Sequence, residues 1–412
     1  MGSARNVGRR FFPLDHELEL LPGELTPHGH ECLVRFASWM PFAKAAETLE
    51  DTLGIRVSKG LAERYTEEAG AAYEALQTEE VEQLEKEMPP AVQGADKMLL
   101  SADGAMVPLL HGTWAEVRTL VVGEVQAPAM ERGQAVVHTR NLSYFSRKVS
   151  AQEFQRLALV EIHRRGIETA KEVAAVMDGA EWEQGFTDFH CLRAIRILDF
   201  AHAGEHLSAI GEFLHGPDTP ESQQWLGERL HQLEHEGPDP LLAELQKLQL
   251  QHSQAQEISG NLAYLQKRRE QMQYPLFHAQ GWPIGSGTVE SGNKLVVEAR
   301  LKGAGMHWHD QHVNPMLTLR NILCSDRWKE EWPKIERRLR LHVSSRRAQL
   351  HQSRSFHLEY SCAFTAPALA PQNDSLTQLR VPKEPTKSRP SPWRYFKHGK
   401  AQYQPSKYPP KI

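Results

Sequence analysis

The spacing of hydrophobic residues divides the chain into helical and strand-like stretches. From His28 to Met88, apolar residues recur at spacings of three and four, which predicts helices. Gly54 and Ser58 interrupt this pattern, and Ser58 is well suited to cap the helix that follows it. We therefore expect residues 1–92 to form an N-terminal helical region.

Alternating and continuous apolar runs follow, and they predict a sheet. The expected strands are Met98–Val107, Trp114–Gly123, Leu142–Ser146, Val173–Met177 and Ala194–Leu198, with an amphipathic helix from Ala151 to Arg165. The first two are joined by a turn at His111-Gly112. Three antiparallel strands followed by two strands with helical segments between them are typical of an RNase H-like α/β fold. This predicts that residues 93–207 form the first part of such a core.

The pattern after the predicted sheet is helical again. Breaks at Gly216-Pro217 and Gly237-Pro238 divide residues 208–281, which predicts an all-helical insertion. Residues 282–340 are expected to complete the core and to carry Glu290. Residues 341–412 are rich in Pro, Ser, Lys and Arg, and we expect a basic tail that is largely disordered.

Composition narrows the class of protein. Apolar residues make up 40% of the 412 residues and charged residues 24%, as in ordinary globular proteins. No apolar run approaches the roughly 20 residues that cross a bilayer. The 4 cysteines form no C-x-x-C pair, so we expect a cytoplasmic protein without a disulfide framework. From Asp326 to the end, Lys and Arg exceed Asp and Glu by 11, which predicts a polyanionic partner for this segment.

Three acids are candidates for the chemistry. Asp103 stands in Ser101-Ala102-Asp103-Gly104 at the end of one apolar run, and Asp178-Gly179 ends another. Each places a carboxylate where a strand is expected to stop and a glycine to let the backbone turn. Glu290 lies just before a helical segment. Taken alone, an Asp-Gly pair is more often a turn than a ligand, but acids at the ends of core elements converge on one rim of a sheet.

Such a rim is suited to two Mg²⁺ or Mn²⁺ ions. Phosphoryl transfer on nucleic acid uses two cations about 4 Å apart, and magnesium prefers one or two carboxylates with water and phosphate completing its shell. In this interpretation Asp103 bridges the two ions, and Asp178 and Glu290 each complete one of them.

A zinc peptidase is the rival interpretation. His202-Ala203-Gly204-Glu205-His206 matches the pattern H-x-x-E-H, for which Glu290 supplies the third ligand. This interpretation leaves Asp103 and Asp178 without a role.

Several segments in order resemble a known family. Asp103, Asp178, Asp199-x-x-His202 and Glu290 after a helical insertion resemble the DDE transposases of bacterial insertion sequences, in the Mutator/hAT-like branch with a C/D-x-x-H motif. The sequences of several segments are most similar to those of ISKra-type transposases. The resemblance covers roughly residues 20–335. It rests on Ser101–Gly104, Trp114–Leu120, Ile197–Asp199, Gly285–Ser291, Met306–Trp308 and Asn314–Leu317.

The resemblance implies a metal-dependent DNA transposase. It implies that Asp103, Asp178 and Glu290 bind the metals, and that His202 with Asp199 supports the site beside the scissile phosphate. Asp178 and Asp199 both remain candidates for the second metal-binding acid, with Asp178 favoured because Asp199 belongs to the D-x-x-H element. The implied partners are the element's terminal repeats, target DNA and a second copy of the chain or a larger assembly. Relatives often begin with a cysteine-rich segment, and this chain has no C-x-x-C, so the alternative is an N-terminally shortened, inactive DNA-binding relic.

Basic residues give candidate DNA contacts. Two helices around the turn near Gly54 predict either a structural hairpin or a helix-turn-helix that reads DNA. Further cations follow Glu290 and cluster near residue 338, where they suit phosphate contacts. The candidates are Lys59, Arg64, Lys294, Arg300, Lys302, Arg337, Arg338 and Arg340.

Overall fold

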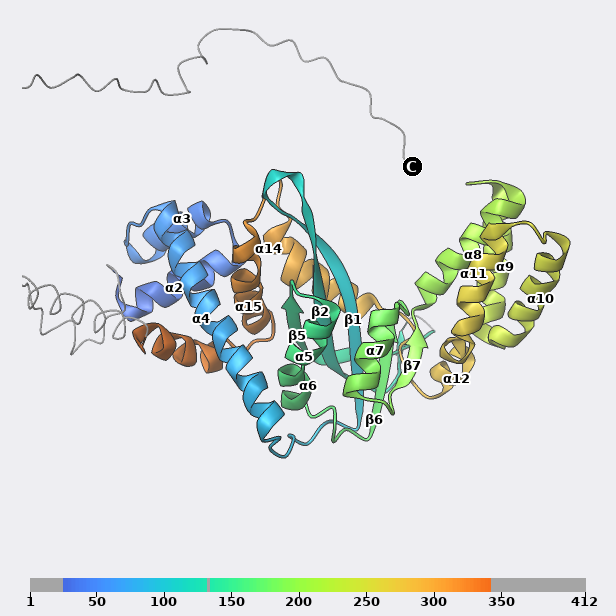
Figure 1. Ribbon diagram of the computed structural model, residues 1–412, viewed down its shortest axis with the longest axis horizontal. Coiled ribbons are helices and arrows are strands. Elements are labelled where there is room, and N and C mark those ends of the chain that lie inside the picture. The colour runs from blue at the N-terminus through green and yellow to red at the C-terminus, as the bar shows by residue number, and fades with distance from the viewer. Residues whose placement is uncertain (1–24, 132–133, 342–412) are drawn as a thin grey trace, which may run out of the picture. The chain divides into compact units, whose positions relative to one another are not determined.

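A mixed five-stranded sheet lies at the centre of the computed structural model, which describes residues 25–131 and 134–341 (Figure 1). Its order is β5-β2-β1-β6-β7. The antiparallel strands are β1 (Lys97–Pro108), β2 (Trp114–Val125) and β5 (Thr139–Arg147), and the parallel additions are β6 (Glu172–Met177) and β7 (Ile195–Leu198). The α/β class and all five strands are confirmed. A small hairpin of β3 (Ala129–Glu131) and β4 (Gln134–Val136) was not predicted.

One face of the sheet is covered by helices that precede and follow β6. These are α5 (Ala151–Leu157), α6 (Leu159–Arg164) and α7 (Glu181–His190), together with the end of α4 (Lys59–Lys86). Leu100 and Ala102 of β1 bury against this layer. Because side chains alternate along a strand, Leu99, Ser101 and Asp103 belong to the other face.

The opposite face carries two separate hydrophobic clusters. Leu99 belongs to one cluster, with β6, β7 and a group of helices, while Ala105 belongs to another, with the helices that follow Glu290. Asp103 therefore interrupts the apolar surface between two packed cores. A polar residue at that position has no packing role of its own, which directs attention to its chemistry.

The stretch after β7 is helical throughout, as predicted, but it begins at Phe200 rather than near residue 208. Its helices are α8 (Phe200–His215), α9 (Pro220–Glu236), α10 (Pro238–Gln251), α11 (Gln256–Lys267), η2 (Arg269–Met272) and α12 (Tyr274–Ala279). Figure 1 shows this group beside β7, and its apolar side chains share a core with that strand.

The described part of the N-terminal region, which begins at residue 25, is mainly helical as expected. It contains α2 (Pro27–Trp39), α3 (Phe42–Leu53) and α4, and Ser58 caps α4 by accepting a hydrogen bond from the backbone N–H of Leu61. These helices share one core with α15 (Val313–Cys324) and the helical residues 328–341. None of the helices in the described ranges has the length and apolar character to cross a membrane.

The segment that carries Glu290 is α13 (Gly287–Gly292), followed by a π-helix, η3 (Asn293–Glu298), and by α14 (Ala299–Leu301). It crosses the sheet closely at Gly292, where an added Cβ would lie 2.7 Å from Val121 Cγ2 of β2. The short 3-10 helices η1 (Leu110–Gly112) and η4 (Asp310–His312) complete the described elements. The predicted tail, residues 341–412, lies outside the described residues except for Leu341, which is helical.

Candidate active site

Three aspartates share one level of the sheet: Asp103 lies in β1, and Asp178 and Asp199 directly follow the parallel strands β6 and β7. The pairing of β1 with β6 matches Leu100 with Ala175, so the same offset places Asp103 level with Asp178. The pairing of β6 with β7 matches Met177 with Leu198, so Asp199 is level with Asp178. Residues at one level of parallel strands project to one face. The register therefore gathers three acids that are far apart in the sequence.

Asp103 lies within β1 rather than at its end, which corrects the expectation of a turn at Gly104. The strand continues in register with β2 to Pro108, and Gly104 pairs with Arg118. What ends near this level is β6, so Asp103 extends beyond its parallel neighbour. One Asp103 oxygen accepts a hydrogen bond from the Gly104 N–H at 2.6 Å, and the other accepts one from Asn293 Nδ2 at 2.8 Å.

The Asp178 turn matches the prediction. β6 ends at Met177, and Gly179 has φ +82, a conformation that L side chains rarely adopt. Residues of the helical stretch hold this turn: the Tyr264 hydroxyl donates to the Asp178 carbonyl at 2.5 Å, and Arg268 Nε donates to the Gly179 carbonyl at 2.9 Å. Burial and the charge of Asp103 raise the pKa of the Asp178 carboxyl to about 6.

Asp199 is buried and its two oxygens have backbone partners. Oδ2 accepts from the N–H of His202 at 2.8 Å and so caps α8. Oδ1 accepts from the N–H of Ser286 at 2.7 Å. By contrast, within the described ranges the Asp178 carboxylate accepts no hydrogen bond. Asp178 therefore has more unused hydrogen-bond acceptor sites than Asp199.

Glu290 approaches the aspartates from α13. Its Oε1 accepts a hydrogen bond from Ser286 Oγ at 3.2 Å, and its side chain is exposed. Burial raises the pKa of Asp103, and the charge of Glu290 contributes to that shift. The first and last predicted acids are thus close enough to interact electrostatically.

His202 lies beside Asp178, whose pKa its charge lowers. Its Nδ1 is 3.2 Å from Glu205 Oε2, and its ring packs edge-on against His206 and Tyr264. Since His202 follows the N-cap of α8 by three residues, Asp199 fixes the position of its backbone.

Sequence reasoning missed two buried residues at this site. Asn293 reaches Asp103, and its own Oδ1 is buried without a hydrogen-bond partner among the described residues. Glu183 accepts hydrogen bonds from the N–H groups of Gly179 and Ala180, and burial with the charge of Asp178 raises its pKa to about 8. Two sequence features could have pointed to these residues. Asn293 follows Glu290 by three positions and so lies on the same side of a helix, and Glu183 is at the third position of α7, where a Glu often accepts from the N-terminal N–H groups.

The acids are not drawn into one tight cluster. Within the described residues, three potential ligand atoms lie within 4.8 Å of one another at Glu63, Glu67 and His312, and not at Asp103, Asp178 and Glu290. A two-cation site has no need of such a cluster, because each ion takes one or two carboxylates and fills its shell with water and phosphate. The oxygen donors, the raised pKa values and the unpartnered Asn293 Oδ1 fit hard divalent cations.

The zinc peptidase prediction finds no support in this arrangement. His206 Nδ1 lies 2.7 Å from Asn261 Oδ1, and its ring stacks on Tyr264 at 3.9 Å between centroids. In the part of the chain that the structure describes, His202, His206 and Glu290 do not form a three-ligand group.

Some of the candidate DNA contacts are exposed, whereas others form ion pairs within the protein. Lys59, Arg64, Lys294 and Arg337 are exposed. Lys302 pairs with Glu298 at 2.6 Å, Arg338 with Glu79 at 2.7 Å and Arg340 with Glu336 at 2.5 Å. These ion pairs are partly exposed, so they compete only weakly with phosphate.

The prediction that Arg300 contacts DNA is wrong. Its side chain is buried, and Nε donates to the Ala37 carbonyl at 2.8 Å. The guanidinium stacks over Phe42 and Trp308 at 4.8 and 5.0 Å from the ring centroids. Helical spacing from Glu290 suggested a phosphate contact, but Arg300 instead joins α14 to the N-terminal helices.

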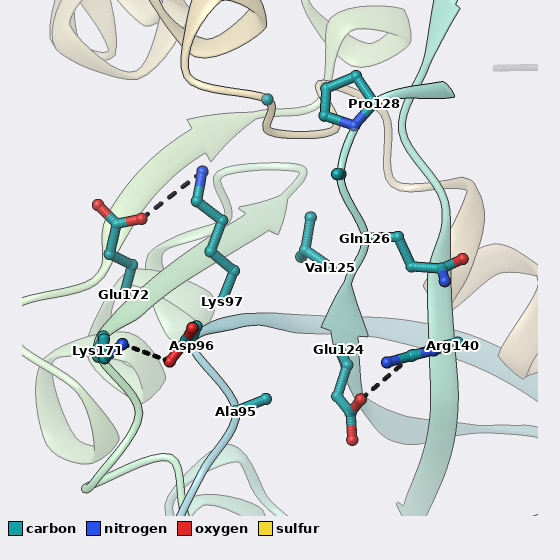
Figure 2. Close-up of a pocket in the computed structure, with 12 residues that line it drawn as sticks. Ala95, Asp96, Lys97, Glu124, Val125, Gln126, Pro128, Arg140, Lys171 and Glu172 are labelled. Carbon is teal, nitrogen blue, oxygen red and sulfur yellow. Dashed lines mark ion pairs between the residues drawn. The ribbon is translucent and has the colours of Figure 1, made fainter. Parts of the chain in front are cut away.

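A cavity of about 760 Å³ lies away from these acids (Figure 2). It is lined by residues at the beginning of β1 and β6, and three ion pairs cross its walls: Lys97–Glu172, Lys171–Asp96 and Arg140–Glu124. Asp103 is six residues further along β1 than Lys97, roughly 20 Å at the rise of a strand. The acids therefore lie further along the sheet, away from this cavity.

Comparison with known proteins adds no assignment: no protein-family model and no curated protein matches the chain.

Proposed function

We propose that this protein is a DNA transposase with an RNase H-like catalytic core that cleaves and joins phosphodiesters with two Mg²⁺ or Mn²⁺ ions. The observation that carries the proposal is the common level of Asp103 and Asp178 on adjacent parallel strands. The order of the five sheet strands, third-second-first-fourth-fifth along the chain, supports the RNase H-like assignment. The acids on the first and fourth of these strands, and Glu290 after a long helical stretch, match the resemblance found in the sequence.

Asp178 is the better second metal-binding acid. Its carboxylate accepts no hydrogen bond within the described ranges, whereas both oxygens of Asp199 are engaged by backbone N–H groups. Hydrogen bonds alone do not exclude a metal ligand, since a carboxylate has about four acceptor sites and each Asp103 oxygen also has a partner. Asp199 differs because it is buried and holds two backbone segments at once, the start of α8 and the segment at Ser286. We therefore assign Asp199 a positioning role.

The residues of the chain would act together on DNA. Asp103, Asp178 and Glu290 would hold the cations, Asn293 orients Asp103, and Ser286 orients Glu290. When bound, two such cations supply charge neutralisation at the phosphate and favour attack by water or a 3′-hydroxyl. His202 lies on the Asp178 side of this group, where it is suited to contact the phosphate or a leaving oxygen. Lys294, exposed on the segment after Glu290, is suited to contact the DNA backbone.

Cleavage of a labelled duplex tests the proposal. The substrate is the DNA that flanks the coding region, incubated with the full-length protein and Mg²⁺ or Mn²⁺. We expect metal-dependent nicking that is lost in Asp103→Asn, Asp178→Asn and Glu290→Gln. The matched controls are Asp188→Asn, an exposed acid paired with Arg196, and His206→Ala, which removes a zinc-motif residue; both should retain activity.

The outcomes separate the candidate functions. Nicking that survives in Asp178→Asn but not in Asp199→Asn would reverse the assignment of the second acid. Activity lost in His206→Ala and retained in Asp103→Asn would overturn the two-cation site. A wild-type protein that binds the duplex without nicking it would be an inactive, DNA-binding relic, the remaining alternative for this chain.

A further inference from the structure

A second group of potential metal ligands lies on the N-terminal helices. Glu63 and Glu67 are one helical turn apart on α4, so their carboxylates lie on one face. His312, at the end of η4, completes the group, and one ligand atom from each residue lies within 4.8 Å of the others. Ligand atoms around a tetrahedral zinc ion are about 3.4 Å apart, given bonds of about 2.1 Å. Small side-chain rotations are enough to close this group around an ion.

The histidine is held in place independently of α4. The segment before it is fixed by Trp308, whose backbone N–H donates to the Pro108 carbonyl at 3.1 Å and whose indole N–H donates to the Leu301 carbonyl at 3.1 Å. Asp310 pairs with Lys148 of the β5 side at 2.7 Å. His312 is therefore presented to α4 by a segment attached to β1 and to the region after β5.

Two carboxylates share a single imidazole in this group. Glu67 Oε1 is buried and pairs with His312 Nδ1 at 2.7 Å. Two carboxylates at this spacing on a helix repel each other. Burial and the charge of Glu63 raise the pKa of Glu67 to about 7, and the charge of His309 opposes this rise. A cation among these groups would neutralise the two carboxylates and remove the repulsion.

We propose that Glu63, Glu67 and His312 bind a divalent transition-metal ion of the Zn²⁺ type, with water or His309 in the remaining position. The imidazole donor favours such an ion over Mg²⁺, which prefers oxygen ligands. The ion would join α4 to the segment that contacts the end of β1. The site is separate from Asp103, Asp178 and Glu290, and its role is structural.

Metal titration of the full-length protein tests this site. The protein is stripped with chelator and carries Asp103→Asn and Asp178→Asn, so that the proposed active site cannot account for binding. We expect one equivalent of Zn²⁺ by equilibrium dialysis, and a visible Co²⁺ absorption band with the intensity of a tetrahedral site. Zn²⁺ should also raise the melting temperature.

Three substitutions identify the ligands. Glu67→Gln, Glu63→Gln and His312→Gln should each weaken Zn²⁺ binding by about a hundredfold or more, since even outer partners of a metal site contribute 10- to 100-fold. Glu68→Gln is the matched control, because Glu68 is exposed on the same helix. Circular dichroism verifies that each variant is folded. Absence of Zn²⁺ binding, or equal binding by the His312→Gln and Glu68→Gln variants, would overturn the proposal and leave the active-site assignment untouched.

Discussion

The carboxylate of Asp199 accepts a hydrogen bond of 2.7 Å from the backbone N–H of Ser286, although the two residues are 87 positions apart. Ser286 in turn donates its hydroxyl to Glu290 at 3.2 Å. The buried acid at the end of β7 thus anchors the segment that carries the exposed acid of α13. This chain of contacts makes Asp199 a positioning residue and Glu290 a residue that depends on it.

Asp199→Asn should reduce the free energy of unfolding by about 1–3 kcal/mol, because the Asn amide nitrogen cannot accept one of the two backbone hydrogen bonds. Asp178→Asn should leave it unchanged or raise it, because it removes repulsion from Asp103. Urea unfolding of both variants without divalent cations measures the difference. Equal destabilisation by the two substitutions would contradict the distinct roles that we assign.

Gly179→Ala should destabilise the protein by about 1–3 kcal/mol for its backbone conformation alone. The new Cβ would also lie 2.5 Å from Arg268 Nε and 2.8 Å from the Tyr264 hydroxyl. Gly185 is the control within the neighbouring helix α7, since an added Cβ there meets nothing within 4 Å. Gly185→Ala should therefore stabilise by about 0.5–1 kcal/mol. Thermal melts of the two variants should shift in opposite directions.

Local patterns predicted the elements well because they depend on nearby residues. The five sheet strands and the helices of residues 28–88 follow from hydrophobic spacing, and the Asp178 turn follows from Asp-Gly chemistry. Local patterns could not decide whether β1 turns at the Asp103-Gly104 pair or continues to Val107, since the sequence supports both. Its partner β2 runs past the end of β6 and supports the longer strand, which is a long-range property of the sheet.

The sequence also could not predict which charged and polar residues are buried. Arg300 and Lys294 share a basic segment, yet Arg300 lies against the aromatic rings of Phe42 in α3 and Trp308. Glu183 and Asn293 belong to the site only because tertiary packing brings them to the aspartates. No local pattern distinguishes such residues from a solvated face.

Lys294→Ala and Arg300→Ala should therefore have different effects. If DNA crosses the face beside Glu290, Lys294→Ala should weaken DNA binding without changing stability. It should also reduce the slope of the log binding constant against log salt concentration by about one. Arg300→Ala should cost about 2–4 kcal/mol of stability, because it removes buried packing and a buried hydrogen bond. Binding titrations at several salt concentrations, together with urea unfolding, separate the two. A stable Arg300→Ala variant would contradict its structural role.

Stability should fall in acid partly because of His30. Burial lowers the pKa of His30 from 6.5 to about 4. The unfolded chain therefore binds more protons between these values, so the stabilisation is complete above pH 6.5 and is lost as the pH falls towards 4. The loss amounts to about 3 kcal/mol at 1.36 kcal/mol per pKa unit. The buried His190, with a pKa of about 4, acts in the same direction.

His30→Phe should flatten this pH dependence, because Phe keeps the contacts with Tyr65 and Trp332 without a titrating ring. Urea unfolding from pH 4.5 to 7.5 measures the slope. His252→Phe is the control, because His252 is exposed. An unchanged slope in His30→Phe would show that His30 does not contribute.

Millimolar Mg²⁺ or Mn²⁺ should raise the melting temperature of the wild-type protein, because cations relieve repulsion among the carboxylates and bind the folded state. The double variant Asp103→Asn/Asp178→Asn should melt at a temperature that Mg²⁺ does not change. An equal rise in both proteins would place the cations elsewhere.

The contact of Asn293 with Asp103 joins residues 190 positions apart. A ribosome must therefore synthesise the chain well past residue 293 before the acids can assemble. Asp103 therefore leaves the ribosome before its hydrogen-bond partner Asn293 has been synthesised. Any cleavage that depends on this site is thereby delayed until synthesis has passed most of the chain, and a product terminated before residue 286 lacks the groups that complete the site.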